Sequence, residues 1–414
     1  MTSTRKLRRM MVVLSVALLL LAAGAVPGLA QPVRIGALFP TTGDLGAFGK
    51  PFYDSAMLAI SQINAQGGVL GGRTLELVLA DSQTNPVQGV AAAQRLVNVD
   101  RVPAIIGAAS SGVTIPVATS VTIPSRVVQI SMASTSPEIT TLNDDDFIFR
   151  TVASDTMQGL VLGQLAKRLG YSRVAVMHVN NSYGLGLAQN FETSFVAEGG
   201  TVTARGPCDQ EQVSYRGELD RAAVGNPEAL VLISYPESGI TILRQSLEGG
   251  YFDKFMFTEG MQAPEVVEAL GEALEGAWGT GPYSAETEAT ERFRTAYEAI
   301  HGTQPATAFM YETYDAAFVI ALAIEKAGEA TGPAIRDAIR QVTNPPGEII
   351  LPGEWAKAVE LIRQGADIQY VGASSPVIFD ENGDIAVATI GIWTVEGGEI
   401  KVVDHQVVGE FEGF

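Results

Sequence analysis

Apolar residues along the chain form two alternating patterns: short continuous runs, and longer segments with a single apolar face. The continuous runs predict buried strands over residues 33–39, 74–80, 104–106 and 127–131. Between them, helical periodicity predicts helices over residues 48–65, 86–99 and 114–121, the second of which starts after the N-cap pair Asn85-Pro86. Apolar strands that alternate with helices are typical of a parallel sheet with helices on both faces.

The same alternation begins again near Ser154. It predicts strands over residues 173–179, 201–204, 229–234 and 254–258, and helices over residues 156–169, 184–197, 215–224 and 240–248. Three further helices, over residues 286–300, 307–327 and 333–341, precede a strand-rich tail with turns at Asn382-Gly383 and Gly397-Gly398. No flexible linker separates the halves. The pattern therefore predicts an α/β protein with two doubly wound parallel-sheet lobes, a hinge and a cleft.

Length and composition agree with two lobes. A chain of 414 residues exceeds what a single hydrophobic core normally supports. Its 46 acidic and 27 basic residues give a formal net charge of −19, which argues against nucleic acid as a partner. Cys208 is the single cysteine, so an intrachain disulfide and a cysteine zinc cluster are excluded. It lies in a short segment that we expect to be a polar connection without a redox role, and no metal or other cofactor is expected.

The first 30 residues have the pattern of a secretory signal peptide. A basic start is followed by an apolar run over residues 10–26, and small residues precede an expected cleavage site after Ala30. A transmembrane anchor is the alternative, but the run is at the lower limit for a span. No cysteine follows it that could carry a lipid. These features predict an exported protein in the periplasm.

Small hydroxyl residues follow two neighbouring strands in the first half. Ser110 and Ser111 come after the strand at 104–106, and Ala133 and Thr135 come after the strand at 127–131. Ligands bind at the carboxyl ends of strands in open parallel sheets. Short hydroxyls and backbone N–H groups there suit a carboxylate, although ordinary helix capping is the alternative.

The second half offers a different set of side chains at its strand ends. Glu259 could accept hydrogen bonds from an ammonium group, and Tyr183 and Tyr235 could pack on a ligand. The alternative is that they are ordinary surface-loop residues. Taken together, the two halves predict a cleft that suits a zwitterion.

Enzymatic signatures are weak. Residues 184–189, Gly-Leu-Gly-Leu-Ala-Gln, follow a strand as a dinucleotide-binding motif would, but Gln189 occupies the place where Gly or Ala is needed. No nucleophile–base pair stands out either. We therefore expect a binding protein and not an enzyme.

Five segments carry a resemblance to a known family: residues 35–43, 63–68, 130–138, 181–186 and 257–260. In this order they resemble the leucine/isoleucine/valine-binding protein family, the exported substrate-binding proteins of ABC transporters. The resemblance covers nearly all of the chain after residue 30. It implies the type I periplasmic binding protein fold, in which three crossovers join two lobes that close over an amino acid.

The resemblance also implies lobe boundaries and ligand contacts. The first lobe would comprise residues 31–152 and about 282–362, and the second residues 153–281 and about 363–414. The family's binding residues fall at positions along both lobes: Phe48, Ser111 or Ser110, Ala133, Thr135, Tyr183, Tyr235 and Glu259. Some members have a disulfide-bonded cysteine where Ser110 stands, and this chain cannot form that bridge.

The implied function is capture of an amino acid, branched-chain or aliphatic, by a monomer that delivers it to a membrane permease. The alternative is a sensing protein for an amide, a urea-like compound or an aromatic acid that signals to a receptor. Transport and sensing use the same fold, so both possibilities stay open.

Overall fold

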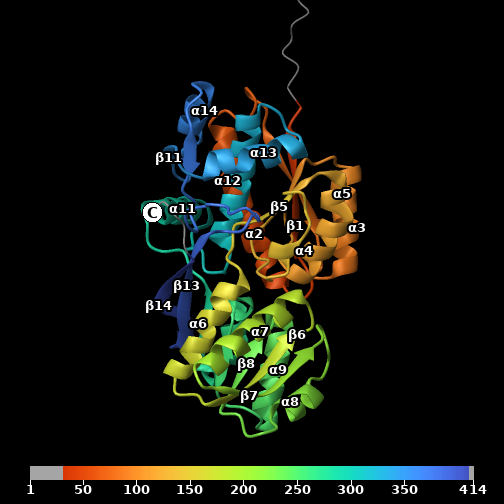
Figure 1. Ribbon diagram of the computed structural model, residues 1–414, viewed down its shortest axis with the longest axis vertical. Coiled ribbons are helices and arrows are strands. Elements are labelled where there is room, and N and C mark those ends of the chain that lie inside the picture. Colours follow the sequence, from red (N-terminus) through yellow and green to blue (C-terminus); the bar gives the residue numbers. More distant parts are fainter. Residues whose placement is uncertain (1–30, 410–414) are drawn as a thin grey trace, which may run out of the picture.

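Two α/β lobes lie end to end in the computed structural model, which describes residues 31–409 (Figure 1). The predicted signal peptide lies outside the described residues. Within residues 31–409, no helix combines the length and apolar character that crossing a membrane requires.

The first lobe contains a fully parallel five-stranded sheet in the order β2-β1-β3-β4-β5. Its strands are β1 (Val33–Phe39), β2 (Leu75–Asp81), β3 (Ala104–Gly107), β4 (Val128–Ser131) and β5 (Ile148–Arg150). Helices α3 (Pro86–Asn98) and α4 (Ser111–Val117) cover one face, and α2 (Gly49–Ala65) and α12 (Met310–Ala327) cover the other. Strand β1 is buried on both faces because Ile35 and Ala37 pack with the α2 side and Leu38 with the α3 side.

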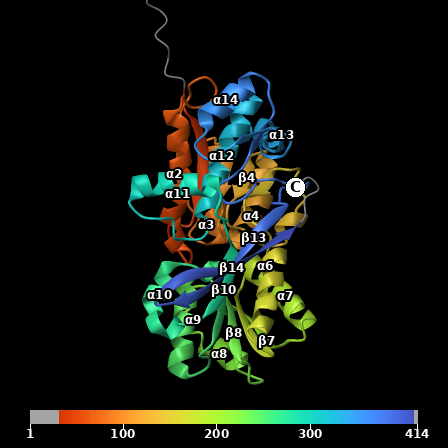
Figure 2. The same ribbon diagram turned by 90° about the vertical axis from the view of Figure 1, so that its left-hand side faces the viewer.

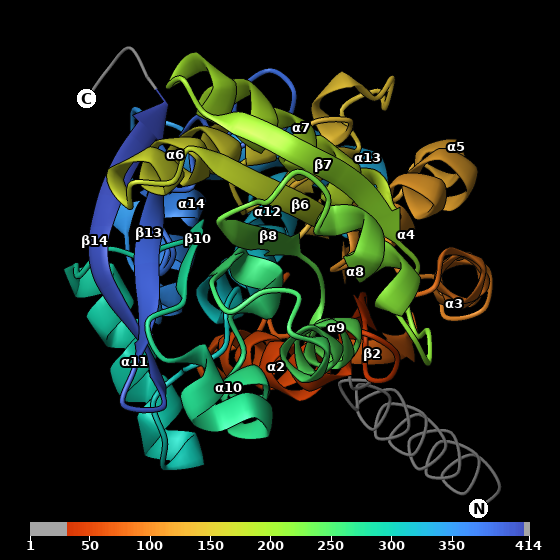
Figure 3. The ribbon, with the colours of Figure 1, turned by 90° about the horizontal axis from the view of Figure 1, so that it is seen from below.

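The second lobe contains a seven-stranded sheet in the order β14-β13-β10-β9-β8-β6-β7. Its parallel part comprises β6 (Arg173–Val179), β7 (Thr201–Cys208), β8 (Ala229–Ile233), β9 (Phe255–Phe257) and β10 (Trp278–Pro282). The hairpin of β13 (Val387–Glu396) and β14 (Glu399–Gly409) extends it antiparallel beyond β10. From below, α6 (Asp155–Arg168) and α7 (Ser182–Ala197) lie on one side, and α8 (Arg216–Ala222), α9 (Pro236–Gly249) and α10 (Pro264–Leu270) on the other (Figure 3).

The chain crosses between the lobes three times: after β5, after β10 and before β13. Between the second and third crossings, the chain adds α11 (Glu288–His301), α13 (Gly332–Thr343), α14 (Trp355–Arg363) and the short strands β11 (Glu348–Ile350) and β12 (Ile368–Tyr370). These helices lie with α2 and α12 in the first lobe (Figure 2). Three crossings place a hinge between the lobes.

The third crossing lies later in the chain than expected. The expected boundary assigns residues 363–386 to the second lobe, but these residues pack on the first. Strand β12 pairs with β11, the Tyr370 hydroxyl donates to Asp315 of α12 at 2.7 Å, and the Phe379 N–H donates to the Asn344 side chain at 3.0 Å. This segment follows no strand–helix alternation, so the pattern of apolar residues contains no signal for its lobe.

The predicted strands and helices are present with shifted ends, but several short elements are absent from the prediction, among them β5, β10, α10 and α14. The expected polar connection at Cys208 is wrong. Strand β7 continues to Cys208, which is buried, and its thiol donates to the His178 carbonyl at 3.2 Å. Because β7 is an edge strand, Pro207 does not interrupt it.

Candidate ligand-binding site

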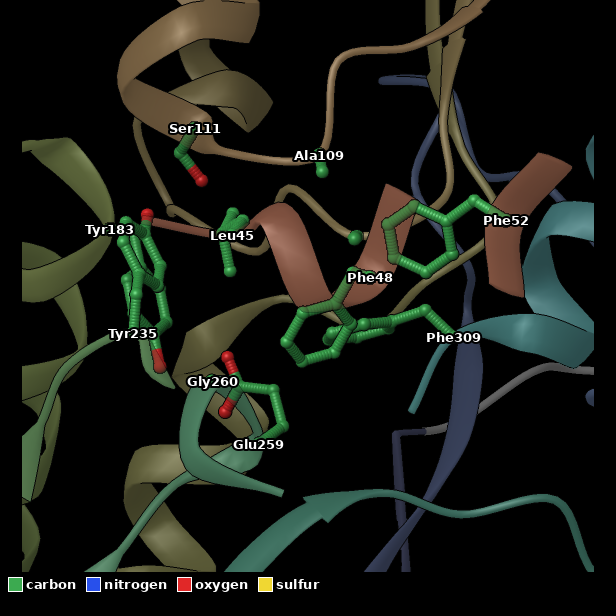
Figure 4. Close-up of a pocket in the computed structure, with 11 residues that line it drawn as sticks. Leu45, Phe48, Phe52, Ala109, Ser111, Tyr183, Tyr235, Glu259, Gly260 and Phe309 are labelled. Carbon is green, nitrogen blue, oxygen red and sulfur yellow. The ribbon is translucent and has the colours of Figure 1, made fainter. Parts of the chain in front are cut away.

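A cavity lies between the lobes (Figure 4). The first lobe lines it with Leu45, Phe48, Phe52, Ala109, Ser111, Ala133 and Phe309, and the second with Tyr183, Tyr235, Glu259 and Gly260. Six of the eight expected binding residues are therefore brought together. The other two, Ser110 and Thr135, lie next to the wall and do not form it.

Three phenylalanines form the apolar end of the cavity. Phe48 precedes α2 and Phe52 lies in its first turn, so the two rings share one face with centroids 5.6 Å apart. Phe309, before α12, completes the cluster at 6.4 Å from Phe48 and 6.5 Å from Phe52. All three side chains are buried. This end can enclose an apolar ligand group.

Two tyrosines form the opposite wall. The rings of Tyr183 and Tyr235 stack with centroids 5.5 Å apart and an interplanar angle of 9°. The Tyr183 hydroxyl shares a hydrogen bond of 2.7 Å with Thr258. The Tyr235 hydroxyl contacts Ser110 of the first lobe at 2.9 Å and accepts from the Asn181 side chain at 3.1 Å. Ser110 thus holds a wall residue in place across the lobe boundary.

Two buried carboxylates lie close together: Glu259 lines the cavity, and Asp155 lies next to it without lining the cavity. Glu259 follows β9 and accepts a hydrogen bond from the Gln158 side chain, which lies three residues after Asp155 on α6. Asp155 is fully buried, and neither of its carboxylate oxygens has a hydrogen-bond partner among residues 31–409. Burial raises the pKa of both groups, and the nearby Glu259 carboxylate raises the pKa of Asp155 further.

The nearest strong cation, Arg150, pairs with groups other than Asp155 and Glu259. Its guanidinium is fully buried and pairs with Asp384, with one bond of 2.7 Å to Oδ2. It also donates to the Ser136 carbonyl at 2.9 Å and to the Thr140 hydroxyl at 2.7 Å. Arg150 therefore fastens the loop around Ser136, and its hydrogen-bonding groups are not directed at Asp155 and Glu259. A ligand ammonium would supply the missing positive charge.

Hydroxyl groups border the other side of the polar end. Ser111 begins α4, and its Oγ accepts from the Ser136 N–H at 3.1 Å, which leaves the hydroxyl proton available to the cavity. Thr135 is fully buried, its Oγ1 has no partner within the described chain, and its carbonyl accepts from the Asp155 N–H at 2.8 Å. Of the two, Ser111 lines the cavity, and its hydroxyl can donate to a carboxylate there.

Sequence reasoning missed Asp155 and Gln158, as well as several wall residues: Leu45, Phe52, Ala109, Gly260 and Phe309. An aspartate that opens a helix is usually explained by the helix dipole, so Asp155 carries no signal that separates binding from helix stabilisation. The spacing of Phe48 and Phe52 could have indicated a shared face. Phe309 comes from a segment more than 200 residues further along the chain, and only the fold brings it to this site.

The lobes are closed over the cavity. Ser110 contacts Tyr235, the Ser136 hydroxyl donates to the Ser182 carbonyl at 3.1 Å, and the Ser238 N–H donates to Asp44 at 2.7 Å. Each of these bonds joins one lobe to the other. A buried cavity between two hinged lobes is the geometry of a clamp that closes on a small ligand.

Residues 32–358 match the family described as periplasmic binding protein. The chain belongs to this family. It is 32% identical over 316 residues to the leucine-, isoleucine-, valine-, threonine- and alanine-binding protein of Pseudomonas aeruginosa. The aligned residues make up 76% of this chain and 83% of that protein. The relationship confirms the family expected from the sequence motifs.

Two further relatives extend the comparison. The chemotactic signal transduction system substrate-binding protein BasB of Halobacterium salinarum is 26% identical over 84% of this chain and 83% of its own length. The crystal structure of the leucine binding protein LivK from Thermotoga maritima superposes with a TM-score of 0.77 and 28% identity, over 90% of this chain and 98% of that one. The type I periplasmic binding protein fold is thereby confirmed.

Proposed function

We propose that this protein captures a free α-amino acid with a branched or aliphatic side chain and delivers it to the permease of an ABC transporter. The observation that supports this proposal most strongly is the pair of neighbouring buried carboxylates, Asp155 and Glu259, neither of which forms an ion pair within the described chain. Leaving such charges buried and unpaired is costly, so a site built this way favours a cationic group.

The rest of the cavity suits the other parts of an amino acid. The ammonium would lie at Glu259, next to Asp155, and the carboxylate would accept a hydrogen bond from the Ser111 hydroxyl, near Thr135. The side chain would then pack against Phe48 and the other phenylalanines. An aromatic acid without an amino group would leave both protein carboxylates unpaired, so the geometry disfavours it.

The relatives support the same substrate class. The Pseudomonas protein is named for binding leucine, isoleucine, valine, threonine and alanine, and the Thermotoga protein is named for binding leucine. We infer that the protein acts as a monomer in the periplasm after removal of the segment that ends near Ala30, and that it binds without catalysis. No nucleic-acid partner is proposed for this acidic chain.

A sensing role is the second candidate. It is supported by the similarity to BasB, whose name places it in a chemotactic signal transduction system. Closure of the lobes around the same ligand would then be recognised by a receptor and not by a permease.

The ammonium site can be tested with Glu259→Gln. The substitution keeps the side-chain shape but removes one of the two charges that would pair with the ligand, so leucine binding should weaken by about 2–5 kcal/mol, roughly 30-fold to several thousandfold. Calorimetric titration with leucine and with 4-methylpentanoate, the same acid without the amino group, separates the ammonium from the side chain. Glu265→Gln, at an exposed position in the first turn of α10, is the matched control.

Leucine should lose far more affinity than 4-methylpentanoate in Glu259→Gln, and the control should bind both as the wild type does. If Glu259→Gln binds leucine within threefold of wild type, the ammonium assignment is wrong. If wild type binds none of the aliphatic amino acids, the proposed substrate class is wrong.

A further inference from the structure

A carboxylate outside the cavity joins the two lobes. Asp44 lies in the loop after β1 of the first lobe and is only 1% exposed. Its Oδ1 accepts two hydrogen bonds from Ser238 in α9 of the second lobe, from the backbone N–H at 2.7 Å and from the hydroxyl at 2.8 Å. Asp44 is not among the residues that line the cavity.

These bonds complete the N-terminus of α9. The first N–H groups of a helix have no partner within the helix, and the side chain of the N-cap residue normally accepts from one of them. In α9 the N-cap is Tyr235, whose side chain makes no capping bond and instead contacts Ser110. Asp44 takes over this function for Ser238, the third residue of the helix. The cap of a second-lobe helix therefore comes from the first lobe.

The loop that carries Asp44 is held firmly in place. Gly43 has a φ of +81°, and a Cβ added there would lie 2.2 Å from the Gln83 carbonyl oxygen. On the other side, the Leu45 N–H donates to the Thr84 hydroxyl at 3.0 Å. Because Leu45 itself lines the cavity, the capping carboxylate and the ligand space are adjacent along the chain.

We propose that Asp44 is an interlobe latch, a positioning residue that stabilises the closed conformation by capping α9 and so sets ligand affinity without touching the ligand. Opening the hinge separates Asp44 from Ser238 and leaves the α9 amide without its cap. A ligand that binds the closed state and not the open one therefore binds more tightly when this contact stabilises closure. The inference rests on the proposed function, because the latch is measured through binding of an amino acid.

The surroundings of Asp44 link the latch to pH. Its Oδ2 has no hydrogen-bond partner in the described chain, and the charged groups that act on it most strongly are acidic: Glu237 on α9, and Glu211, whose N–H donates to the Ser238 hydroxyl at 3.0 Å. Three neutral titratable side chains also face it, those of Cys208, Tyr215 and Tyr235. Burial raises the pKa of the Asp44 carboxyl to about 6.

The sign of the effect follows from the raised pKa. In an open protein Asp44 would meet water and ionise at its ordinary, lower pKa, so closure takes up a proton as the pH falls towards 6. The latch therefore strengthens in mildly acidic solution. Asp155 and Glu259 act in the opposite direction, because pairing with an ammonium requires their ionised forms. The effect of Asp44 is therefore measured as the difference in the pH dependence of ligand affinity between wild type and Asp44→Asn, which cannot titrate at this position.

The test is leucine titration of wild type, Asp44→Ala, Asp44→Asn and Ser238→Ala at about pH 7.5 and pH 5.5. Asp44→Ala removes the acceptor of two bonds and should weaken binding about tenfold to a hundredfold. Ser238→Ala removes the hydroxyl but keeps the backbone N–H, so leucine binding should weaken by about threefold. Asp44→Asn keeps one acceptor oxygen and should bind within threefold at pH 7.5. Glu265→Ala, at an exposed position in the first turn of α10, is the control.

The pH dependence separates a latch from a merely structural residue. The ratio of the Asp44→Asn to the wild-type dissociation constant should rise by threefold or more between pH 7.5 and pH 5.5. Equal affinity of Asp44→Ala and wild type for leucine, or a ratio that does not change with pH, overturns the proposal.

A second measurement keeps the latch testable if leucine does not bind. Hydrogen exchange of the Ser238 amide, in the protein without added ligand, should be faster in Asp44→Ala than in wild type, whereas amides in the middle of α9 should exchange alike. Failure of wild type to bind leucine contradicts the proposed function alone, and exchange then decides the latch. In that case, identical exchange of the Ser238 amide in the two proteins overturns it.

Discussion

Two buried aspartates, one in each lobe, have opposite surroundings. Asp315 on α12 accepts four hydrogen bonds, from the Tyr370 hydroxyl at 2.7 Å, the Ala373 N–H at 2.8 Å, and the Ser374 N–H and hydroxyl at 2.8 and 2.6 Å. Asp155 on α6 is equally buried, and neither of its oxygens has a partner in the part of the chain that the structure describes.

The difference separates a structural carboxylate from one available to a ligand. Buried polar groups in native proteins are normally hydrogen-bonded, and an unpaired one calls for an explanation. All four hydrogen bonds to Asp315 come from the protein itself, from Tyr370 at the end of β12 and from Ala373 and Ser374 just after it. Asp155 lies next to Glu259, which lines the interlobe cavity, and we propose that a ligand in that cavity provides the missing donor. Burial of an acid therefore does not by itself indicate function, whereas burial without partners at a cavity does.

Asp315→Asn should produce the largest effect on stability. The amide cannot accept bonds on its nitrogen, so at least one buried donor loses its partner, and unfolding should become easier by about 2–4 kcal/mol. Chemical denaturation of the ligand-free protein measures the loss. Asp367→Asn, at an exposed site, should change stability by less than about 0.5 kcal/mol. If Asp315→Asn lowers the free energy of unfolding no more than the control does, the four hydrogen bonds to this carboxylate contribute little to stability.

Asp155→Asn should have the opposite effect on the ligand-free protein. An acid whose pKa is raised by burial binds protons more tightly when folded, so the folded protein loses stability as the pH rises from the unfolded-state pKa of Asp155 towards its folded-state pKa. Removing the charge should stabilise the ligand-free protein by about 1–2 kcal/mol. Thermal unfolding at several pH values should also show a weaker loss of stability with rising pH.

The same variant should bind leucine more weakly than wild type, since it lacks one of the two charges that face the ammonium. Destabilisation of the ligand-free protein together with unchanged leucine affinity would place Asp155 in the same class as Asp315.

Cys208→Ser should have the smallest effect. Burial raises the pKa of the thiol to about 12, so it is protonated at neutral pH, and a serine hydroxyl could still donate to the His178 carbonyl. Leucine affinity should stay within threefold of wild type and stability within about 1 kcal/mol. A tenfold loss of affinity would show that Cys208, which faces Asp44 at the N-terminus of α9, influences ligand binding.

The sequence predicts most of the fold because its strands and helices have strong local signals. The apolar run of β1 and the cap at Asn85, whose side chain accepts from the N–H groups of Val87 and Gln88, illustrate this. The turn at Gly397-Gly398 likewise joins β13 and β14. The segment between residues 363 and 386 has no such periodicity, and its place in the first lobe depends on Asp315 and Asn344, which lie far from it in sequence.

The sequence by itself determined the alternation of strands and helices, the two lobes and the residue types at strand ends, among them Ser111, Tyr183 and Glu259. These properties follow from local periodicity and from the rule that strand ends form the binding edge. Only the tertiary structure decided which acid is unpaired, which phenylalanines meet and which lobe caps α9. Hydrogen-bond satisfaction and burial are properties of neighbours in space, and the chain brings Asp155, Glu259 and Phe309 together only when both lobes are folded and closed.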